Sequence, residues 1–181
     1  MITSQRQAPA GGAEILAKHL NELIPPDPLS GGVLDVSQPI RIFTVKLNDI
    51  TGPDFIRKAF PIGWRYFVPI EDSMAVADLA ATTGANLSTS EELSFGSLTR
   101  GKLAEQLGSA AKLAEKKYGS GNDHYEARIL EIPGLYVVAL WLHGTQDIFI
   151  MAGANDAVQE DSAFVTTVVN LAEAKRNEVD Q

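Results

Sequence analysis

Two histidines and an aspartate in the last third of the chain have the residue types and spacing that could do chemistry. His124 and His143 flank a predicted pair of strands, and Asp147 follows a short polar stretch. A two-residue turn at Pro133-Gly134 would place His143 opposite His124. A three-residue loop at 144–146 would place Asp147 opposite His143. Two imidazoles and a carboxylate within about 5 Å of one another suit a divalent metal or a hydrogen-bonded general base.

The same three residues also have a purely structural interpretation, which the sequence favours. Polar side chains gather where strands end and meet water, and flat pairing points neighbouring side chains parallel to one another rather than towards one ion. A two-residue loop at 144–145 would turn Asp147 to the other face of the sheet. No fourth ligand is evident nearby. The sequence therefore predicts no stoichiometric metal and no cofactor.

A second polar group shares this predicted face. With the same turn, Glu126 lies opposite Trp141, and Arg128 lies two residues along the strand. Such a strip could hold a ligand or a peptide. The interpretation that the sequence favours is a solvated face on which Arg128 covers Trp141. The candidate ligand-binding residues, none with a catalytic role, are His124, Glu126, Arg128, Trp141, His143 and Asp147.

The strand that carries Trp141 belongs to the most apolar stretch of the chain, EIPGLYVVALWLHG. Residues 135–142 do not alternate between apolar and polar, which predicts a central strand covered on both faces. The second cover could be a loop, the amino-terminal helix or a partner subunit. A run of this length is far shorter than the roughly 20 apolar residues that span a bilayer.

Apolar spacing and turn residues predict the elements around this strand. Helices are expected at 13–23, 54–60, 99–118 and 158–176, and strands at 39–47, 63–70, 124–132, 135–143 and 147–152. Residues 74–80 suit a strand or a helix, and the small, polar residues 82–96 predict a loop. Short turns between consecutive strands indicate antiparallel pairs. The expected fold is α+β: a single, mainly antiparallel sheet with helices packed on one face.

The amino-terminal part is expected to stand apart from this fold. Residues 1–24 are interpreted as a tail, disordered through residue 12, followed by a docking helix whose apolar stripe packs on the domain or on another copy. A linker rich in Pro and Gly is expected at 25–37. A single α+β domain is expected at 38–181.

Composition excludes several classes of function. The chain of 181 residues has no cysteine, which excludes disulfides, thiolate nucleophiles and sulfur-based zinc sites. Its formal net charge of −8 argues against nucleic acid as a partner. The absence of a signal-like or membrane-spanning run predicts a cytoplasmic protein without a membrane partner. Neither a phosphate-binding loop nor a GxSxG elbow occurs in the sequence.

The run YEARILEIPGLYVVALWLHG, followed by DIFIM, resembles a motif of bacterial domains of unknown function. That motif reads roughly IPxLYVxALWL, with a DxF strand after it. The resemblance covers residues 125–151 and implies a shared sheet, but it carries no activity.

These observations favour a non-catalytic module that binds a protein partner, possibly its own copy as a homo-oligomer. The features that support this hypothesis are the doubly covered strand, the separate first helix and the lack of a catalytic motif. The alternative is a metal-dependent hydrolase or a small-ligand-binding enzyme that uses His124, His143 and Asp147.

Overall fold

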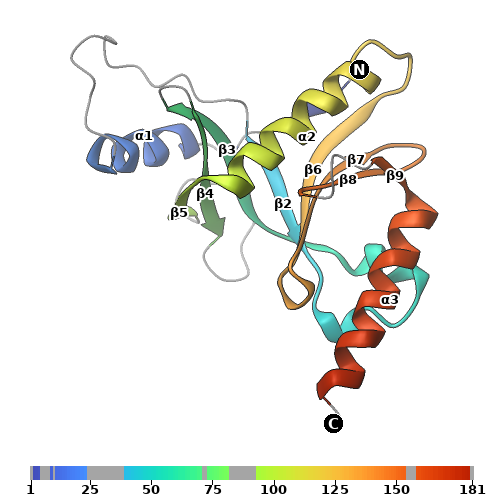
Figure 1. Cartoon of the computed structure of the whole chain (residues 1–181). Helices are drawn as coiled ribbons and strands as arrows, with labels where there is room; N and C mark the ends of the chain where they lie inside the picture. Colours follow the sequence, from blue (N-terminus) through green and yellow to red (C-terminus); the bar gives the residue numbers. More distant parts are fainter. Residues whose placement is uncertain are drawn as a thin grey trace.

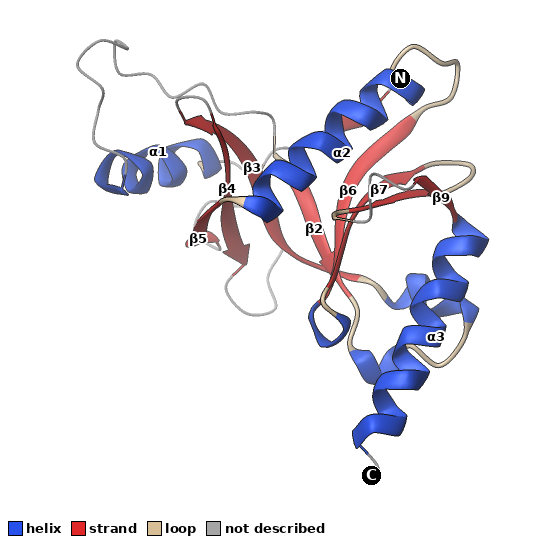
Figure 2. Ribbon diagram, viewed as in Figure 1, coloured by secondary structure: helices blue, strands red, loops and turns tan. Residues whose placement is uncertain are grey.

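The computed structural model describes residues 2–4, 9, 11–23, 39–70, 73–81, 93–153 and 158–179; the linker expected at 25–37 and most of the loop expected at 82–96 lie outside them. The helical elements are α1 (Gly12–Leu23), η1 (Leu47–Asp49), η2 (Pro53–Lys58), α2 (Lys102–Tyr118), η4 (Pro133–Leu135) and α3 (Asp161–Val179), where η marks a 3-10 turn. The strands are β1 (Ile2–Ser4), β2 (Ile40–Thr44), β3 (Phe60–Ile70), β4 (Ser73–Ala81), β5 (Leu93–Arg100), β6 (Tyr125–Ile132), β7 (Val137–His143), β8 (Ile148–Met151) and β9 (Val158–Glu160). Figures 1 and 2 show how these elements are arranged.

All nine strands belong to one sheet, in the order β5-β4-β3-β2-β6-β7-β8-β9, with β1 paired to β6. β1 and β2 run parallel to β6, and the other described pairs are antiparallel. The α+β class and the single, mainly antiparallel sheet are therefore confirmed. The predicted antiparallel neighbours β6, β7 and β8 are confirmed as well. The β2–β6 pair is parallel because a long connection through β3, β4, β5 and α2 carries the chain back across the sheet.

The helices lie on both faces of this sheet, which differs from the expected packing on one face. Ile129 of β6 packs in a cluster with α2, and its neighbour Leu130 packs in a cluster with α3. Successive strand residues point to opposite faces, so α2 and α3 lie on opposite sides. Arg41 of β2 lies opposite both Trp64 and Arg128, and residues that lie opposite each other share a face of the sheet. The cluster that contains Trp64 and α1 is therefore on the same face as α3. In Figure 1, α2 crosses in front of the sheet.

β7 is covered on both faces, as its unbroken apolar sequence predicts. Leu140 and Leu142 pack in the α2 cluster, whereas Ala139 and Trp141 pack in the α3 cluster. The latter also contains Phe55 of η2. The second cover, which the sequence left open, is therefore α3 together with η2.

A short strand at residues 2–4 corrects the interpretation of residues 1–12 as a disordered tail. β1 pairs with the first residues of β6. On that side of β6, β2 pairs only with residues 128–131. The remaining backbone groups of β6 need hydrogen-bond partners, and β1 supplies them. This pairing depends on the rest of the sheet, and nothing in the sequence of residues 1–12 predicts it.

The loop expected at 82–96 is wrong at its carboxyl end, where residues 93–96 belong to β5. Residues 74–80 form a strand, because they pair with β3 and β5 as part of β4. The register of the β4–β5 pair shifts at Gly96, which has no partner on β4. A bulge of this kind adds one residue and breaks the alternation of side chains. Three apolar residues at irregular spacing therefore share one cluster: Leu93, Phe95 and Leu98.

Two helices begin later than the sequence predicts. Gly101 has a φ of 94° between β5 and α2, and α2 begins at Lys102 instead of Thr99. α3 begins at Asp161 because residues 158–160 pair with β8 as β9. In both places sheet pairing takes residues that helical spacing had assigned to the helix.

α1 packs on the sheet of its own chain. Leu16 and Leu20 are fully buried in one cluster with Trp64 and Tyr66 of β3. The start of the helix lies so close that a Cβ on Gly12 would stand 2.7 Å from the Tyr66 hydroxyl. The apolar stripe of the helix is thus part of the core, while the division into a linker and a domain at 38–181 stays a prediction.

The phenol of Tyr66 is expected to titrate well above its ordinary range. Burial raises the pKa of its phenol from 10.0 to about 12, because the charged phenolate loses hydration. A raised pKa means that the folded state favours the protonated phenol, so stability falls as pH rises from 10 towards 12. Spectrophotometric titration should show a late phenolate step that disappears in Tyr66→Phe. Titration of all tyrosines together near their ordinary value would contradict this.

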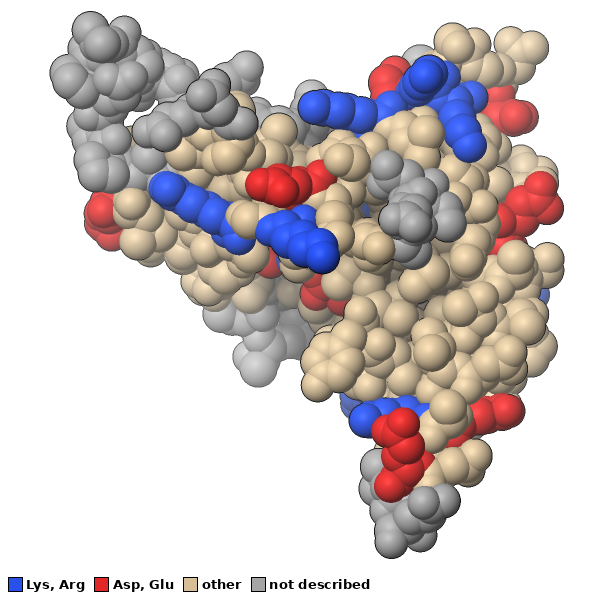
Figure 3. All heavy atoms as spheres, viewed as in Figure 1, with Lys and Arg blue, Asp and Glu red and all other residues tan. Residues whose placement is uncertain are grey.

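Charged side chains are spread over the face seen in Figure 3, and basic ones gather near the carboxyl end of α2. The last turn of that helix carries Lys116 and Lys117, whose positive charges interact favourably with the negative end of the helix dipole. Within the described part of the chain, every helix is too short or too polar to cross a bilayer.

Candidate functional site

The register between β6 and β7 differs from the predicted one. His143 lies opposite Glu126, not opposite His124, and Arg128 lies opposite Trp141. His124 precedes β6 and is exposed. The predicted row of His124, His143 and Asp147 is therefore wrong, although the division of residues between the two faces is right.

The cause of the shift is the turn at the start of β7. It was expected to have two central residues, but η4 at Pro133–Leu135 and Tyr136 form a four-residue turn. Tyr136 adopts a left-handed conformation with a φ of 54°. The longer turn lets Leu135 pack against the α3 cluster. It moves the register by two residues, which keeps each side chain on its predicted face.

His143 and Asp147 form the pair that the predicted 144–146 loop would bring together. The distance between His143 Nδ1 and Asp147 Oδ1 is 2.8 Å. The backbone N–H of Gly144 donates to the same oxygen at 3.2 Å. Leu142 pairs with Ile148, which fixes the two flanking positions opposite each other. This pairing confirms the loop length and orients the imidazole.

Arg128 is fixed between two aromatic rings. Its guanidinium carbon lies 4.9 Å from the ring centroids of both Phe43 and Trp141. Glu126 accepts two hydrogen bonds from it, at 2.9 and 3.2 Å. Arg128 therefore covers Trp141, as the sequence favoured, and its charge is already matched by a neighbour on the same strand.

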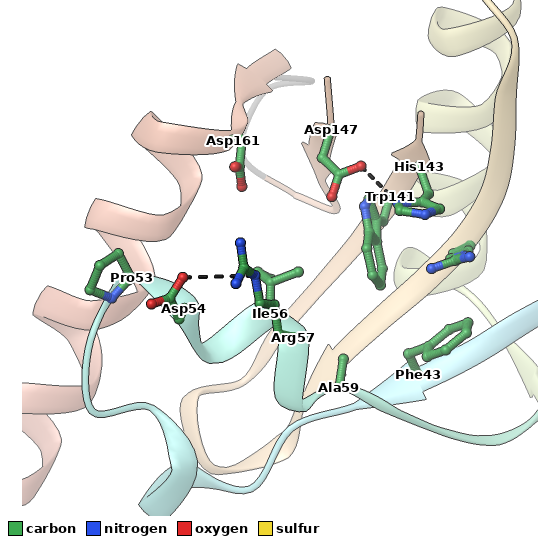
Figure 4. Close-up of a pocket in the computed structure, with 11 residues that line it drawn as sticks. Phe43, Pro53, Asp54, Ile56, Arg57, Ala59, Trp141, His143, Asp147 and Asp161 are labelled. Atoms are coloured by element: carbon green, nitrogen blue, oxygen red, sulfur yellow. Dashed lines mark hydrogen bonds and ion pairs between the residues drawn. The ribbon is translucent and has the colours of Figure 1, made fainter. Parts of the chain in front are cut away.

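These side chains open onto a pocket of about 440 Å³ on the α3 side of the sheet. Its walls come from β2, η2, β6, β7, the loop before β8 and the first turn of α3 (Figure 4). The residues that line it are Phe43, Pro53, Asp54, Ile56, Arg57, Ala59, Arg128, Trp141, His143, Asp147 and Asp161. Four sequence-predicted candidates lie on or support one wall, whereas His124 is not part of the lining; Glu126 holds Arg128 from outside it.

The wall formed by η2 and α3 was missed by sequence reasoning. Asp54 and Arg57 fall in the helix expected at 54–60, and Asp161 falls in the helix expected at 158–176. Residues separated by about a hundred positions meet here only because α3 packs beside η2. The sequence holds no local signal for this contact, apart from the polar side chains on otherwise apolar segments.

Two carboxylates face each other at the upper end of the pocket in Figure 4. Asp161 is exposed, but partial desolvation raises the pKa of its carboxyl group, and the negative charge of Asp147 raises it further. Arg57 lies on the opposite wall, 3.8 Å from Asp54, and both of these side chains are more than four-fifths exposed. The lining therefore has three carboxylates near this end, those of Asp54, Asp147 and Asp161, and the guanidinium of Arg57 points towards the same end in Figure 4.

Trp141 brings a polar atom to the same end. The residue is only 3 % exposed, and its Nε1 has no hydrogen-bond partner among the described residues. In Figure 4 the nitrogen edge of the indole points towards Asp147. A buried N–H without an acceptor is costly, so it is usually explained by a water or a ligand.

The pocket can orient a ligand and exchange protons with it. His143 is held through Nδ1, which leaves its other ring nitrogen to donate or accept. Among the described residues that line the pocket, none is Ser, Thr, Cys or Lys. Throughout the described ranges, no cluster of three or more His, Asp or Glu side chains is arranged to hold a metal ion.

Comparison with known proteins gives no relative from which a role could be transferred. No family model, no curated protein and no solved structure matches this chain. The resemblance to bacterial domains of unknown function therefore stays a prediction.

Proposed function

We propose that this chain is a small-molecule-binding module whose ligand sits in the pocket between η2, α3 and β7. The observation that carries the proposal is the convergence of polar groups from separate elements on one concavity of about 440 Å³. Ligand sites are usually concave, partly apolar, and hundreds of cubic ångströms in volume. The module uses His143 and Asp147, as the sequence-based alternative expected, but without His124 and without a metal.

The walls of the pocket are held in place by packing. Trp141 stacks on Phe149 at 5.7 Å, and Phe149 stacks on Phe164 of α3 at 4.0 Å. Phe149 and Phe164 are fully buried. Arg128 is fixed on the other side of the indole by its two hydrogen bonds. Side chains that are already ordered lose little entropy when a ligand binds, which favours affinity.

Intrinsic fluorescence offers a direct test, since the chain has only two tryptophans. In Trp64→Phe, Trp141 is the only indole, and its emission reports on the pocket. A panel of small amines, carboxylates, sugars and nucleosides should contain compounds that change this emission and raise the melting temperature. Ala59→Leu places extra bulk in the lining and should weaken such binding about tenfold, which corresponds to about 1.4 kcal/mol.

The matched control is Ala163→Leu, because Ala163 is exposed on α3 and is not part of the lining. This variant should bind the same compounds within about twofold. Equal affinity of both variants, or a complete lack of response across the panel, would contradict a ligand site at this place.

Binding of a protein partner, which includes another copy of this chain, is the second candidate function. We also propose that the protein is cytoplasmic. β5 ends the order of the described strands on one side of the sheet. The outer edge of such a strand can pair with another chain. A mass by light scattering that matches a single chain at all concentrations would contradict self-association.

A further inference from the structure

We infer that the pocket takes an amine with an apolar body and a neighbouring oxygen acceptor, and that its ammonium group lies between Asp147 and Asp161. This inference rests on the proposed function and adds the chemical class of the ligand.

The positive charges around the pocket already have partners. Glu126 binds Arg128 through both carboxylate oxygens, at 2.9 and 3.2 Å. Asp54 lies 3.8 Å from Arg57 on the exposed side of η2. Arg128 is therefore a weak attraction for an anionic ligand, Arg57 is largely exposed and screened by solvent, and the net charge of −8 repels anions from the whole molecule.

The two carboxylates at the other end are less well matched. Asp147 uses Oδ1 for both His143 and the backbone of Gly144, which leaves Oδ2 towards the pocket. Within the described part of the chain, no hydrogen bond or ion pair reaches the carboxylate of Asp161. Two facing carboxylates repel each other, and a cation between them removes the repulsion and gains charge-assisted hydrogen bonds.

The indole of Trp141 is a second, independent indication of a ligand. It is 3 % exposed, its Nε1 has no partner among the described residues, and its nitrogen edge points to the acidic end. The carboxylate of Asp147 lies nearby but does not accept this N–H. An acceptor oxygen on the ligand, next to its amine, would complete the hydrogen bond. The donor at Trp141 and the acceptors at Asp147 and Asp161 together describe an amino alcohol or a similar group.

The rest of the pocket suits an apolar body. In Figure 4, Phe43 and Ala59 lie at the end away from Asp161, Ile56 lies between the two ends, and Pro53 lies on the side of η2. Burial of a branched alkyl group against these side chains removes apolar surface from water. Four small probes separate these features: leucinol has the amine, the oxygen and the body; isoamylamine lacks the oxygen; isoamyl alcohol lacks the amine; isovalerate carries the opposite charge.

The experiment is a fluorescence titration of Trp64→Phe with each of the four probes. Leucinol should bind most tightly, isoamylamine next, and isoamyl alcohol and isovalerate about tenfold or more weakly than leucinol. Asp161→Asn should weaken the binding of leucinol about tenfold and leave isoamyl alcohol within about twofold. The melting temperature of this variant should change little, because Asp161 is exposed and no hydrogen bond or ion pair among the described residues holds its carboxylate.

Glu160→Gln is the matched control. It removes the same charge from the adjacent residue, which is exposed like Asp161 but lies outside the lining. Leucinol should bind this variant within about twofold of the parent, since only a local contact is lost in Asp161→Asn. Similar losses in both variants would show a general effect of net charge and overturn the inference.

Other results would overturn the inference without removing the proposed function. Isovalerate or isoamyl alcohol binding as tightly as isoamylamine would exclude recognition of an ammonium group. Zinc ions could also change the fluorescence of Trp141. If that change were stronger than any change caused by the amines and were lost in His143→Ala, the acidic end would be a metal site. No response to the four probes, together with a response to another compound of the wider panel, would retain a ligand site but reject this class of ligand.

Discussion

Replacing Arg65 by methionine is expected to lower the free energy of unfolding by about 3–5 kcal/mol. Arg65 is 4 % exposed on the α2 side of the sheet, and Asp78 accepts two hydrogen bonds of 2.7 Å from it. Its Nη1 also lies 2.8 Å from Glu131 Oε1, but off the direction of the N–H, so this pair is held mainly by charge. Removal of the cation would leave two partly buried carboxylates without their shared counter-ion.

Arg65 keeps its positive charge in a buried position because the carboxylates of Asp78 and Glu131 lie close to it. Burial alone would lower the pKa of the guanidinium, but the hydrogen bond and charge of Asp78 and the charge of Glu131 outweigh it and raise the pKa. The matched control is Arg57→Met, in which the lost ion pair is long and its side chains are 86 % and 81 % exposed. That change should stay within about 0.5 kcal/mol, because exposed pairs contribute little.

Denaturant melts of both variants at neutral pH give the comparison. A second replacement, Asp78→Asn in the Arg65→Met background, should recover part of the loss, because one of the two stranded charges is removed. If Arg65→Met and Arg57→Met lose the same small amount, the Arg65 network is not a main source of stability. If Asp78→Asn adds further destabilisation, repulsion between the carboxylates is not the cause of the loss.

Leu140→Ala is expected to cost about 2–5 kcal/mol, since it removes a buried leucine and leaves a cavity. Leu140 is 2 % exposed in the middle of β7 and pairs with Ile129 on one side and Ile150 on the other. All three pack in the cluster under α2. The surrounding strands are fixed by hydrogen bonds on both sides, so the cavity has little freedom to collapse.

Lys116→Ala on the exposed side of α2 serves as the control and should change stability by no more than about 0.5 kcal/mol. Unfolding of both variants in urea, with the slope compared as well as the midpoint, separates a loss of stability from a change in the denatured state. A loss at Leu140 as small as the loss at Lys116 would show that β7 is not the central strand of the core.

The sequence predicts those parts of the fold that follow from local periodicity. The unbroken apolar run of β7 predicts a doubly covered strand, and α2 and α3 appear where residues of one face recur at helical spacing. It does not predict β5, because the bulge at Gly96 interrupts alternation. It does not predict β1, which exists because β6 has backbone groups beyond the end of β2. Hydrogen bonding between distant segments leaves no period in either segment.

The candidate site divides in the same way. The short loop between β7 and β8 is local, so the sequence limited it to two lengths, and the three-residue alternative brings His143 and Asp147 together at 2.8 Å. The face shared by Arg128 and Trp141 also follows from alternation along the strands, which a two-residue shift in register preserves. The residue opposite His143 on β6 depended on the length of the turn before β7. Only the packing of Leu135 against the α3 cluster decided that length. The far wall, with Arg57 and Asp161, was decided entirely by the tertiary structure, because contacts between η2 and α3 come from side-chain packing over a long separation in sequence, which no local pattern encodes.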